Sequence, residues 1–394
     1  MPAQKLWTKD FIFIMLANMF LALVFYILLT TLALYSTKTY NVSASLAGFT
    51  ATLFVVGALF GRIFTGRYIE LIGRRRLTYT SCILFFLASF VYFINGGIGI
   101  LLAARIIHGI LFGIFSTAIC VLVLSYIPND RRGEGIGYFS LSTTLMIAVG
   151  PFIGILITQH YNYNLLFVVC SIFALCTLIL IFFIKITDIE LSDEQLLNIK
   201  KGFRFSDFFE VKVLPISVIF IILGICYSSV AAFVSLYSAE MGEAGIASIF
   251  FLIYAGFILL SRPVSGRLLD KKGDNIVMYP AIICFSAALL LLGIANDRII
   301  FLLSAVFVAF GFGNLMPLGQ TIAVKSVPQH RVGMATSTFF VCADAGMGTG
   351  AAIMGLIVPW KGYSGMYLTG AVIILLSIIL YYFLHGRRAG AREN

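Results

Sequence analysis

Charged residues are scarce in this 394-residue chain. Asp, Glu, Lys and Arg together make up 11% of the residues, and 60% are apolar. An average soluble domain has about 25% charged and roughly 45–50% apolar residues. A soluble protein of this length needs more charge to cover its surface, and the same composition excludes a disordered chain, a collagen and a secreted disulfide scaffold. Long apolar runs containing 36 Gly and 37 Phe indicate a polytopic membrane protein.

Cysteine pairs and metal-ligand patterns are also missing. The seven cysteines lie in apolar segments, none forms a C-x-x-C pair, and their number is odd, so neither a disulfide framework nor a zinc site is expected. The four histidines are scattered without the spacing of metal ligands on a helix. We expect no metal and no cofactor. Because the apolar segments hold no clustered nucleophiles or paired carboxylates, we also expect that the protein is not an enzyme.

Twelve apolar stretches are long enough to cross a bilayer core of about 30 Å, which requires about 20 helical residues. They cover residues 11–35, 45–67, 77–94, 98–126, 134–157, 164–185, 213–238, 246–267, 276–295, 299–323, 332–358 and 364–384. The sequence therefore predicts an all-α membrane protein with twelve transmembrane helices. A polar segment at 187–211 divides the chain, as a cytoplasmic linker, into six-helix bundles at 1–186 and 212–394.

Basic residues predict the orientation, because they concentrate in cytoplasmic loops. With the N-terminus inside, 21 of the 27 Lys and Arg residues fall on inner loops and termini, three within spans and three on outer loops. Both termini are therefore expected in the cytoplasm, with the chain in the cell membrane. The net charge of +10 follows from this topology, so it is not evidence for nucleic-acid binding.

The chain repeats itself at an offset of 200 residues. The segment from Arg62 to Gly73 aligns with that from Arg262 to Gly273, and Gly133 and Gly150 have counterparts at 333 and 350. One offset serves three helices of each half, which indicates a duplicated six-helix unit. Because six is even, both copies enter the membrane from the same side, so the two bundles are expected to be related by pseudo-symmetry about the membrane normal, as parallel repeats are.

The loop after the second span resembles the signature loop of the major facilitator superfamily, Gly-x-x-x-Asp-Arg-x-Gly-Arg-Arg. The resemblance implies a cytoplasmic latch between two halves that alternately open, although Glu70 replaces the Asp and Leu71 the first basic residue. Glu70 is expected to accept from free N–H groups at the start of a neighbouring helix. The alternative is a purely topological basic anchor. The predicted latch residues are Arg62, Gly66, Arg67, Glu70, Gly73, Arg74, Arg75, Arg262, Gly266 and Asp270. The side chains of Arg62 and Arg262 are expected to reach the inner interface along their stems.

The fourth span carries Arg105, an arginine too costly to face lipid. Arg105 to Gly109 resembles the Arg-x-x-Gln-Gly motif of proton-coupled family members, with His108 in place of Gln. The resemblance implies a role for Arg105 in proton coupling or in the central cavity. The alternative is a structural arginine bonded to backbone carbonyls of the first helix. His108 adds a titratable group, or is a core histidine.

The fifth span contains Gly150, Pro151 and Gly154, which resemble part of the Gly-Pro-x-x-Gly-Gly motif of the antiporter branch. The resemblance favours export over uptake, although Leu141 and Ile155 stand where that branch has glycines. Proline and glycine also account for a simple kink and close helix packing.

Asp344, in the eleventh span, is the acid that lies well inside a predicted span. An intramembrane acid is costly and is a functional hypothesis by default. Small neighbours, Ala343 and Gly346 among them, leave room for another helix or water. We interpret Asp344 as a proton carrier or a counter-charge for a cationic substrate, the alternative being a hydrogen-bonded residue of the core.

These features together predict a secondary transporter, functional as a monomer in a lipid bilayer, that exports a small amphiphilic drug or metabolite and is driven by protons. Sugars and opine-type metallophores are alternative substrates, and nutrient uptake by symport is the alternative direction. Polar or aromatic residues that are candidates for the substrate cavity are Asn18, Tyr26, Tyr227, Tyr254, Asn314 and Gln320.

Overall fold

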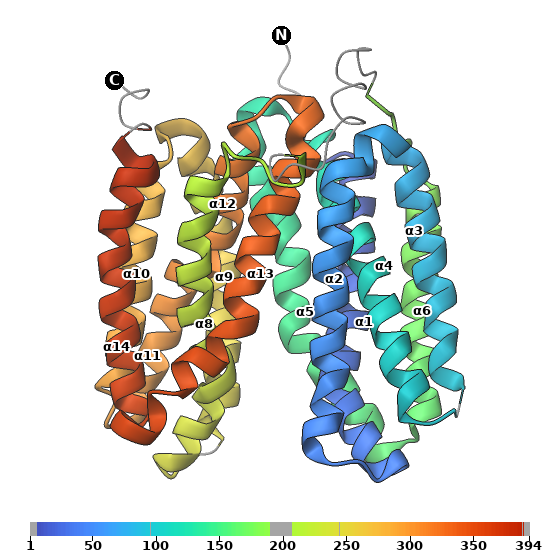
Figure 1. The fold of residues 1–394 in the computed structure, drawn as a ribbon. Helices are drawn as coiled ribbons and strands as arrows, with labels where there is room; N and C mark the ends of the chain where they lie inside the picture. The colour runs from blue at the N-terminus through green and yellow to red at the C-terminus, as the bar shows by residue number, and fades with distance from the viewer. Residues whose placement is uncertain (1–5, 95, 190–206, 244, 388, 390–394) are drawn as a thin grey trace. The chain divides into compact units, whose positions relative to one another are not determined.

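The computed structural model describes residues 6–94, 96–189, 207–243, 245–387 and 389. The regular elements in this part of the chain are all helices, and within each compact unit the long helices run roughly parallel (Figure 1). The first half contains α1 Lys9–Tyr40, α2 Ala44–Ile72, α3 Arg74–Ala88 with η1 Ser89–Phe93, α4 Ile98–Leu124, η2 Asn129–Arg131, α5 Arg132–His160 and α6 Tyr163–Phe182. The second contains α8 Leu214–Glu240, α9 Ile246–Lys272, α10 Asn275–Gly293, α11 Arg298–Val308, η4 Ala309–Gly313, α12 Asn314–Lys325, η5 Gln329–Arg331, α13 Val332–Gly355, α14 Val358–Tyr381 and η6 Tyr382–Gly386.

Eleven helical segments of the described chain are long and apolar enough to span a membrane, and α11, η4 and α12 together form one of them. The 24-residue α13 has sufficient length but a lower hydropathy, because Asp344 and several Gly and Thr residues interrupt its apolar sequence. With α13 counted as the remaining span, the predicted all-α fold with twelve transmembrane helices is confirmed. Large apolar side chains such as Phe152, Leu252 and Phe383 are about two-thirds exposed or more, as expected where lipid is the solvent.

α14 starts at Val358, with Pro359 in the first turn, where a helix does not need its N–H group. Gly362 has non-helical backbone angles (φ 66°, ψ −179°), so the uninterrupted helix begins after it, close to the predicted residue 364. The tenth predicted span is interrupted by the π-helical turn η4, where Gly311 has non-helical backbone angles.

The chain forms two compact units. Unit 1 consists of Met1–Pro128, Ser142–Glu210 and Pro328–Ser337, and unit 2 of Asn129–Leu141, Val211–Val327 and Thr338–Asn394. Each unit follows one predicted half, except that the start of α5 belongs to unit 2 and the start of α13 to unit 1. Residues 190–206 of the predicted linker lie outside the described residues, and the described residues at both ends of the linker, up to Glu210, belong to unit 1.

The same helix pairs pack in both units. In unit 1, α2 packs on α4, α1 on α6, and α3 on both α4 and α6. In unit 2, the counterparts at an offset of 200 residues do the same: α9 packs on α11, α8 on α14, and α10 on both α11 and α14. Gly73 and Gly273, which end α2 and α9, have φ angles of 95° and 86°, so both loops use a glycine turn that other residues rarely adopt.

Glycines let α2 and α4 approach until their backbones touch. A Cβ atom on Gly57 would lie 2.4 Å from Ile106 O, and one on Gly109 would lie 2.2 Å from Phe54 O. Both distances are impossible contacts, so a side chain at either position must push the helices apart. Small residues of this kind are the usual means of close helix packing in membranes, where apolar surfaces gain little from leaving lipid.

Replacing Gly109 by alanine is therefore expected to destabilise unit 1 by about 1–3 kcal/mol, the usual cost of an overpacked core. The measurement is thermal unfolding of the purified protein in detergent. Gly99→Ala on the same helix is the control, because a Cβ atom there has nothing within 4 Å. Equal unfolding temperatures for the two variants would contradict the close α2–α4 contact.

Candidate functional site

Arg105 is completely buried in α4 and is held by residues of two neighbouring elements. Its Nε donates to Thr50 O in α2 at 2.7 Å, and its Nη1 donates to Tyr92 OH in η1 at 3.2 Å. The guanidinium carbon lies 4.1 Å from the centre of the Phe54 ring, a cation–π contact. Arg105 is thus bonded to a backbone carbonyl, as the structural alternative expected, but this carbonyl belongs to the second helix instead of the first.

His108 lies one turn further along α4 and is joined to Arg105 through Tyr92. Tyr92 OH and His108 Nδ1 are 2.8 Å apart. Because Arg105 can only donate, the Tyr92 oxygen accepts from it, and the hydroxyl hydrogen is then free to bond His108 Nδ1. This assignment makes His108 neutral, with its hydrogen on Nε2. His108 Nε2 and Arg105 Nη2 are buried without hydrogen-bond partners among the described residues.

Arg105 and His108, two of the predicted coupling residues, are thus neighbours in unit 1, and the connecting Tyr92 was not predicted. Tyr92 lies 16 residues before His108 at the C-terminal end of the third span, where no pattern in the sequence distinguishes it from the other aromatic residues. Asp344, the third predicted residue, lies in unit 2 and is half-buried in the middle of α13.

The small residues around Asp344 do let another helix approach. A Cβ atom on Gly346 would lie 2.3 Å from Ile221 O, and one on Gly224 would lie 3.0 Å from Ala343 O. α13 and α8 are therefore in backbone contact on both sides of Asp344. The predicted motif in α5 has the corresponding position in unit 1: a Cβ atom on Gly150 would meet Tyr26 Cβ of α1 at 2.5 Å. α5 continues through Pro151 to His160, and Gly154 packs on Thr31 of α1.

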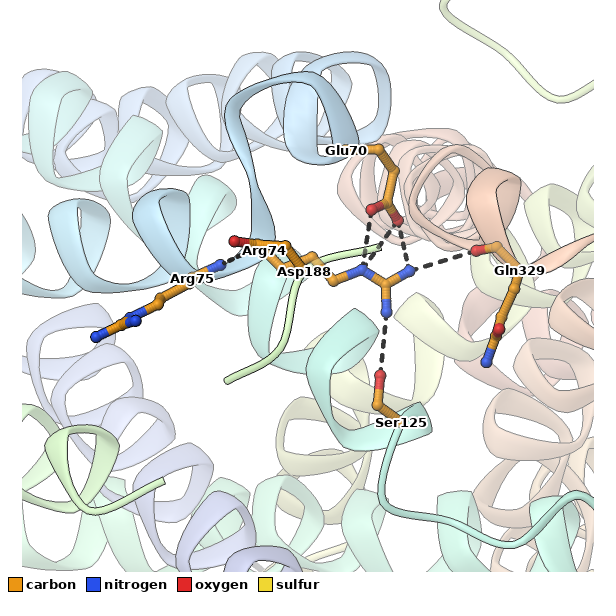
Figure 2. A network of polar contacts seen from close by, with 6 residues as sticks. All are labelled: Glu70, Arg74, Arg75, Ser125, Asp188 and Gln329. Atoms are coloured by element: carbon orange, nitrogen blue, oxygen red, sulfur yellow. Dashed lines mark hydrogen bonds and ion pairs between the residues drawn. The ribbon is translucent and has the colours of Figure 1, made fainter. Parts of the chain in front are cut away.

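The loop after α2 forms a buried network around Arg74 (Figure 2). Arg74 Nε lies 3.0 Å from both carboxylate oxygens of Glu70, Nη1 donates to Ser125 Oγ at 3.0 Å, and Nη2 donates to Gln329 O at 3.3 Å. One guanidinium therefore ties the end of α2 to the end of α4 and to the turn η5 before α13. The expectation that Glu70 accepts from a helix N-terminus is wrong, because Arg74, four residues later, takes both of its oxygens.

In the second copy, Asp270 has the role expected of Glu70. Asp270 Oδ1 accepts from Gly133 N at 2.8 Å and Oδ2 from Glu134 N at 3.0 Å, which are free N–H groups at the start of α5. Lys325 Nζ lies 2.8 Å from Asp270 Oδ1 and balances its charge. Arg74 is replaced by Asp274 at the repeat position, so no arginine is available there to take the carboxylate.

Gly66 and Gly266 make these contacts possible. A Cβ atom on Gly66 would lie 2.4 Å from Ser337 Cβ at the start of α13, and one on Gly266 would lie 2.6 Å from Gly133 O at the start of α5. Ser337 Oγ also donates to Arg62 O at 2.7 Å. The predicted latch glycines thus face the starts of α13 and α5 in their respective units.

The two copies differ again at Glu134, whose repeat counterpart is Met334. Glu134 is buried, and its carboxylate forms two ion pairs: Oε2 lies 2.7 Å from Arg131 Nη2 and Oε1 lies 2.8 Å from Arg267 Nε. Met334 has no carboxylate and offers the corresponding Arg331 only its sulfur, which accepts from Arg331 Nη2 at 3.4 Å. Instead, Arg331 Nε lies 2.5 Å from Glu210 Oε2 at the end of the linker, and the Arg67 guanidinium lies 4.3 Å above the ring of Phe208. Two linker residues therefore occupy the role that a single helical glutamate has in the other copy.

The beginning of the linker is fixed to the same loop. Asp188 Oδ1 accepts from Arg75 N at 2.9 Å, a free N–H group at the start of α3 (Figure 2). Tyr79 OH donates to Ile184 O at 3.2 Å, and Tyr126 OH donates to Lys185 O. The sequence marked this stretch as polar but contained no signal that Asp188 would contact the start of α3 or that Glu210 would contact Arg331.

The expectation that Arg62 and Arg262 reach the inner interface along their stems stays a prediction. Both are at least nine-tenths buried within their helices. Arg62 Nη1 donates to Thr117 Oγ1 of α4 at 3.4 Å. Arg262 Nε and Nη1 have no hydrogen-bond partner in the described part of the chain.

The predicted cavity residues fall into three groups. Asn18 is satisfied, because its amide donates to Ser142 Oγ and Thr143 Oγ1 at 2.7 and 2.8 Å. Asn314 is satisfied as well, at the break in the tenth span. Gln320 Nε2 is buried without a partner among the described residues. The aromatic members pack against neighbouring helices: Tyr26 against Gly150, Tyr227 stacked 3.8 Å from Phe312, and Tyr254 beside Gly313.

We predict that Glu210→Gln loosens the start of α13, because Arg331 loses its carboxylate. A cost of roughly 1–2 kcal/mol corresponds to about a 5- to 30-fold larger open population. The measurement is hydrogen–deuterium exchange of the backbone at 328–337. Glu240→Gln, an exposed site on α8, is the matched control.

Met334→Glu should restore protection in the Glu210→Gln background, because it supplies the carboxylate that Glu134 provides in the other copy. Unchanged exchange in Glu210→Gln, or failure of Met334→Glu to restore it, would show that the linker does not hold the start of α13.

Comparison with known proteins agrees with this architecture. The model of the Major Facilitator Superfamily matches residues 14–313 and 241–394. The staphylopine export protein of Staphylococcus aureus (strain Mu50 / ATCC 700699) is 25% identical over 84% of both chains. The uncharacterized MFS-type transporter MJ1560 of Methanocaldococcus jannaschii is 26% identical over 84% of this chain and 89% of its own.

Solved structures share the fold. The human organic anion transporter MFSD10 (TETRAN) has a TM-score of 0.77 at 14% identity, covering 96% of this chain and all of that one. The proton:xylose symporter XylE has a TM-score of 0.76 at 15% identity, covering 95% and 94%. Family model, relatives and fold agree, and the chain therefore belongs to the Major Facilitator Superfamily of multi-pass membrane transporters.

Proposed function

We propose that this transporter exports a small amphiphilic molecule, a drug or a metabolite, in exchange for protons by alternating access. The outward direction is supported by the relative named as a staphylopine export protein, which matches over 84% of both chains. The resemblance of Gly150, Pro151 and Gly154 to the antiporter motif supports the same direction. The name of that relative also favours an opine-type metallophore as a second candidate substrate.

The observation that carries the proton coupling is the position of Asp344. It lies 12 residues after the first residue of the 24-residue α13, between two backbone contacts with α8. Acids inside membrane spans are rare and commonly mark proton or ion pathways. Export would proceed as a proton arriving from outside neutralises Asp344 and substrate leaves in the opposite direction. Arg105 and His108 are the second candidates, because they form a buried polar chain through Tyr92.

We further propose that the protein lies in the cell membrane with both termini in the cytoplasm. The asymmetric distribution of Lys and Arg supports this orientation. In that orientation the networks around Arg74 and Asp270 are on the cytoplasmic side, where they would close the inner gate.

Asp344→Asn is expected to abolish gradient-driven transport and to leave downhill exchange of substrate intact, because the variant keeps the shape of the side chain but cannot release a proton. The measurement uses everted vesicles with a panel of dyes, antibiotics, metallophores and metabolites, with and without a pH gradient. Asp130→Asn, an exposed cytoplasmic acid, is the control.

Two results would overturn the proposal. Accumulation in everted vesicles that ignores the pH gradient in the wild-type protein would remove proton coupling altogether. Normal gradient-driven accumulation by Asp344→Asn would remove Asp344 as the carrier and leave Arg105 and His108 to be tested by substitution.

A further inference from the structure

The tenth span of unit 2 is broken, and its break is held by α9. Asn314 Nδ2 donates to Ala309 O at 3.2 Å and to Ser261 Oγ at 2.9 Å, while its Oδ1 accepts from Ser265 Oγ at 2.9 Å. The amide thus satisfies a carbonyl that the π-helical turn leaves free. Interrupted helices in transporters commonly border the site where the substrate binds.

Arg262 lies on the same stretch of α9, next to Ser261. It is 3% exposed, and its Nε and Nη1 have no hydrogen-bond partner within the described residues. The described chain provides no carboxylate in an ion pair with it. A buried guanidinium that lacks a counter-charge, and hydrogen bonds at two of its three nitrogens, is strongly unfavourable, so the position favours an anion supplied from elsewhere.

The internal repeat explains why Arg262 lacks an acceptor. Its counterpart Arg62 donates to Thr117 Oγ1 and lies near enough to Cys120 to interact with it electrostatically. The residues at the repeat positions of Thr117 and Cys120 are Pro317 and Gln320. Proline has no hydroxyl group, so the acceptor used by the first copy is missing from the second.

Gln320 adds a donor at this place. It is 3% exposed, and its Nε2 also lacks a partner in the described structure. Cys120 lies close to Arg62 in the first copy, and α12 packs on α9 in the second, so the repeat predicts that Gln320 lies beside Arg262. We therefore infer that the unpartnered donors of this guanidinium and this amide share one buried region. Donors of these two kinds bind a carboxylate well, because an ionised acceptor strengthens each hydrogen bond.

An aromatic cluster adjoins this region in unit 2. The rings of Tyr227 and Phe312 are stacked with centroids 3.8 Å apart, and Tyr254 lies 6.4 Å from Tyr227. Tyr254 also interacts electrostatically with Arg262. The start of α5 covers the same stretch, since a Cβ atom on Gly137 would lie 3.6 Å from Arg262 O. A separation of the start of α5 from α9 would open a route to the donors.

We propose that Arg262 and Gln320 bind the carboxylate of the exported substrate, and that the rings of Tyr227, Tyr254 and Phe312 contact its apolar part. The substrate is then a carboxylate-bearing amphiphile, not the cationic drug that an apolar cavity alone suggests. This inference rests on the proposed export function and specifies its substrate class.

The test uses three probes that differ only in their head group: naphthylacetate, naphthylacetamide and naphthylethylamine. Binding to the purified full-length protein is measured by isothermal titration without any pH gradient. Wild-type protein is expected to bind the acid at least about tenfold more tightly than the amide, and Arg262→Met should lose this preference. Gln320→Cys, which copies the first repeat, should weaken binding of the acid. Lys361→Met removes one charge at an exposed site and is the control.

Pro317→Thr separates ligand binding from a structural role. The new hydroxyl should accept from Arg262 as Thr117 accepts from Arg62, raise the unfolding temperature of the empty protein and weaken binding of naphthylacetate. It also keeps the proposal testable if Arg262→Met does not fold. If Pro317→Thr stabilises the protein without changing the affinity for naphthylacetate, the free donors of Arg262 bind only water and the proposal is wrong.

Equal binding of the acid and the amide by the wild-type protein, or tighter binding of the amine, would also overturn the proposal. These outcomes are distinguishable from failure of the proposed function. Head-group selectivity without any effect of a pH gradient on export would remove proton coupling and retain the site. Gradient-driven export with no head-group selectivity would retain proton coupling and remove the site.

Discussion

A charge buried among membrane helices must find its partners inside the protein, and this constraint accounts for most of the polar architecture of the chain. Water is absent from the bilayer core, so an unsatisfied polar group there costs several kcal/mol. Arg105 meets the constraint at Nε and Nη1, through a carbonyl and a tyrosine hydroxyl, and its guanidinium lies over an aromatic ring. Asn314 meets it by bonding a carbonyl freed at a helix break. Arg262 does not meet it at Nε and Nη1 within the described residues, and the proposed ligand site is built on this observation.

The internal duplication shows how the same constraint is met in two ways. Both copies keep the glycine turn and the same helix pairs. Both also keep an arginine four residues before a packing glycine, Arg62 before Gly66 and Arg262 before Gly266. Their carboxylates have diverged. Asp270 binds the start of α5 directly, whereas Glu70 is taken by Arg74, which then reaches Gln329 O itself. Glu134 serves two arginines from within its helix, whereas Met334 leaves that role to linker residues.

Much of the fold could be predicted because its signals are local. Span boundaries follow from hydropathy, so most lie within a few residues of the observed helix ends, and the turns at Gly73 and Gly273 follow from the need for a positive φ. The π-helical turn at Ala309–Gly313 was missed, because an apolar sequence does not distinguish a continuous helix from one repaired by a distant amide.

The polar contacts were less predictable because they join residues far apart in the sequence. Tyr92, Asp188 and Glu210 act through partners 16 to 121 positions away, and nothing in their own surroundings indicates those partners. The exchange of roles between Glu70 and Asp270 depends on one neighbour, Arg74, whose local attraction exceeds that of a helix terminus. The motif identified the loop, but it could not identify which carboxylate, Glu70 or Asp270, binds the free N–H groups at the start of another helix.

The exchanged segments have a consequence for biogenesis. Unit 1 includes residues 328–337, which are synthesised only after ten spans have been made. Although domains generally fold in order of synthesis, this one must wait for a late piece of the nascent chain. Until that piece arrives, Gly66 lacks its contact with Ser337 and Arg74 lacks Gln329 O, so the early bundle would leave these groups accessible to the insertion machinery or to a membrane chaperone.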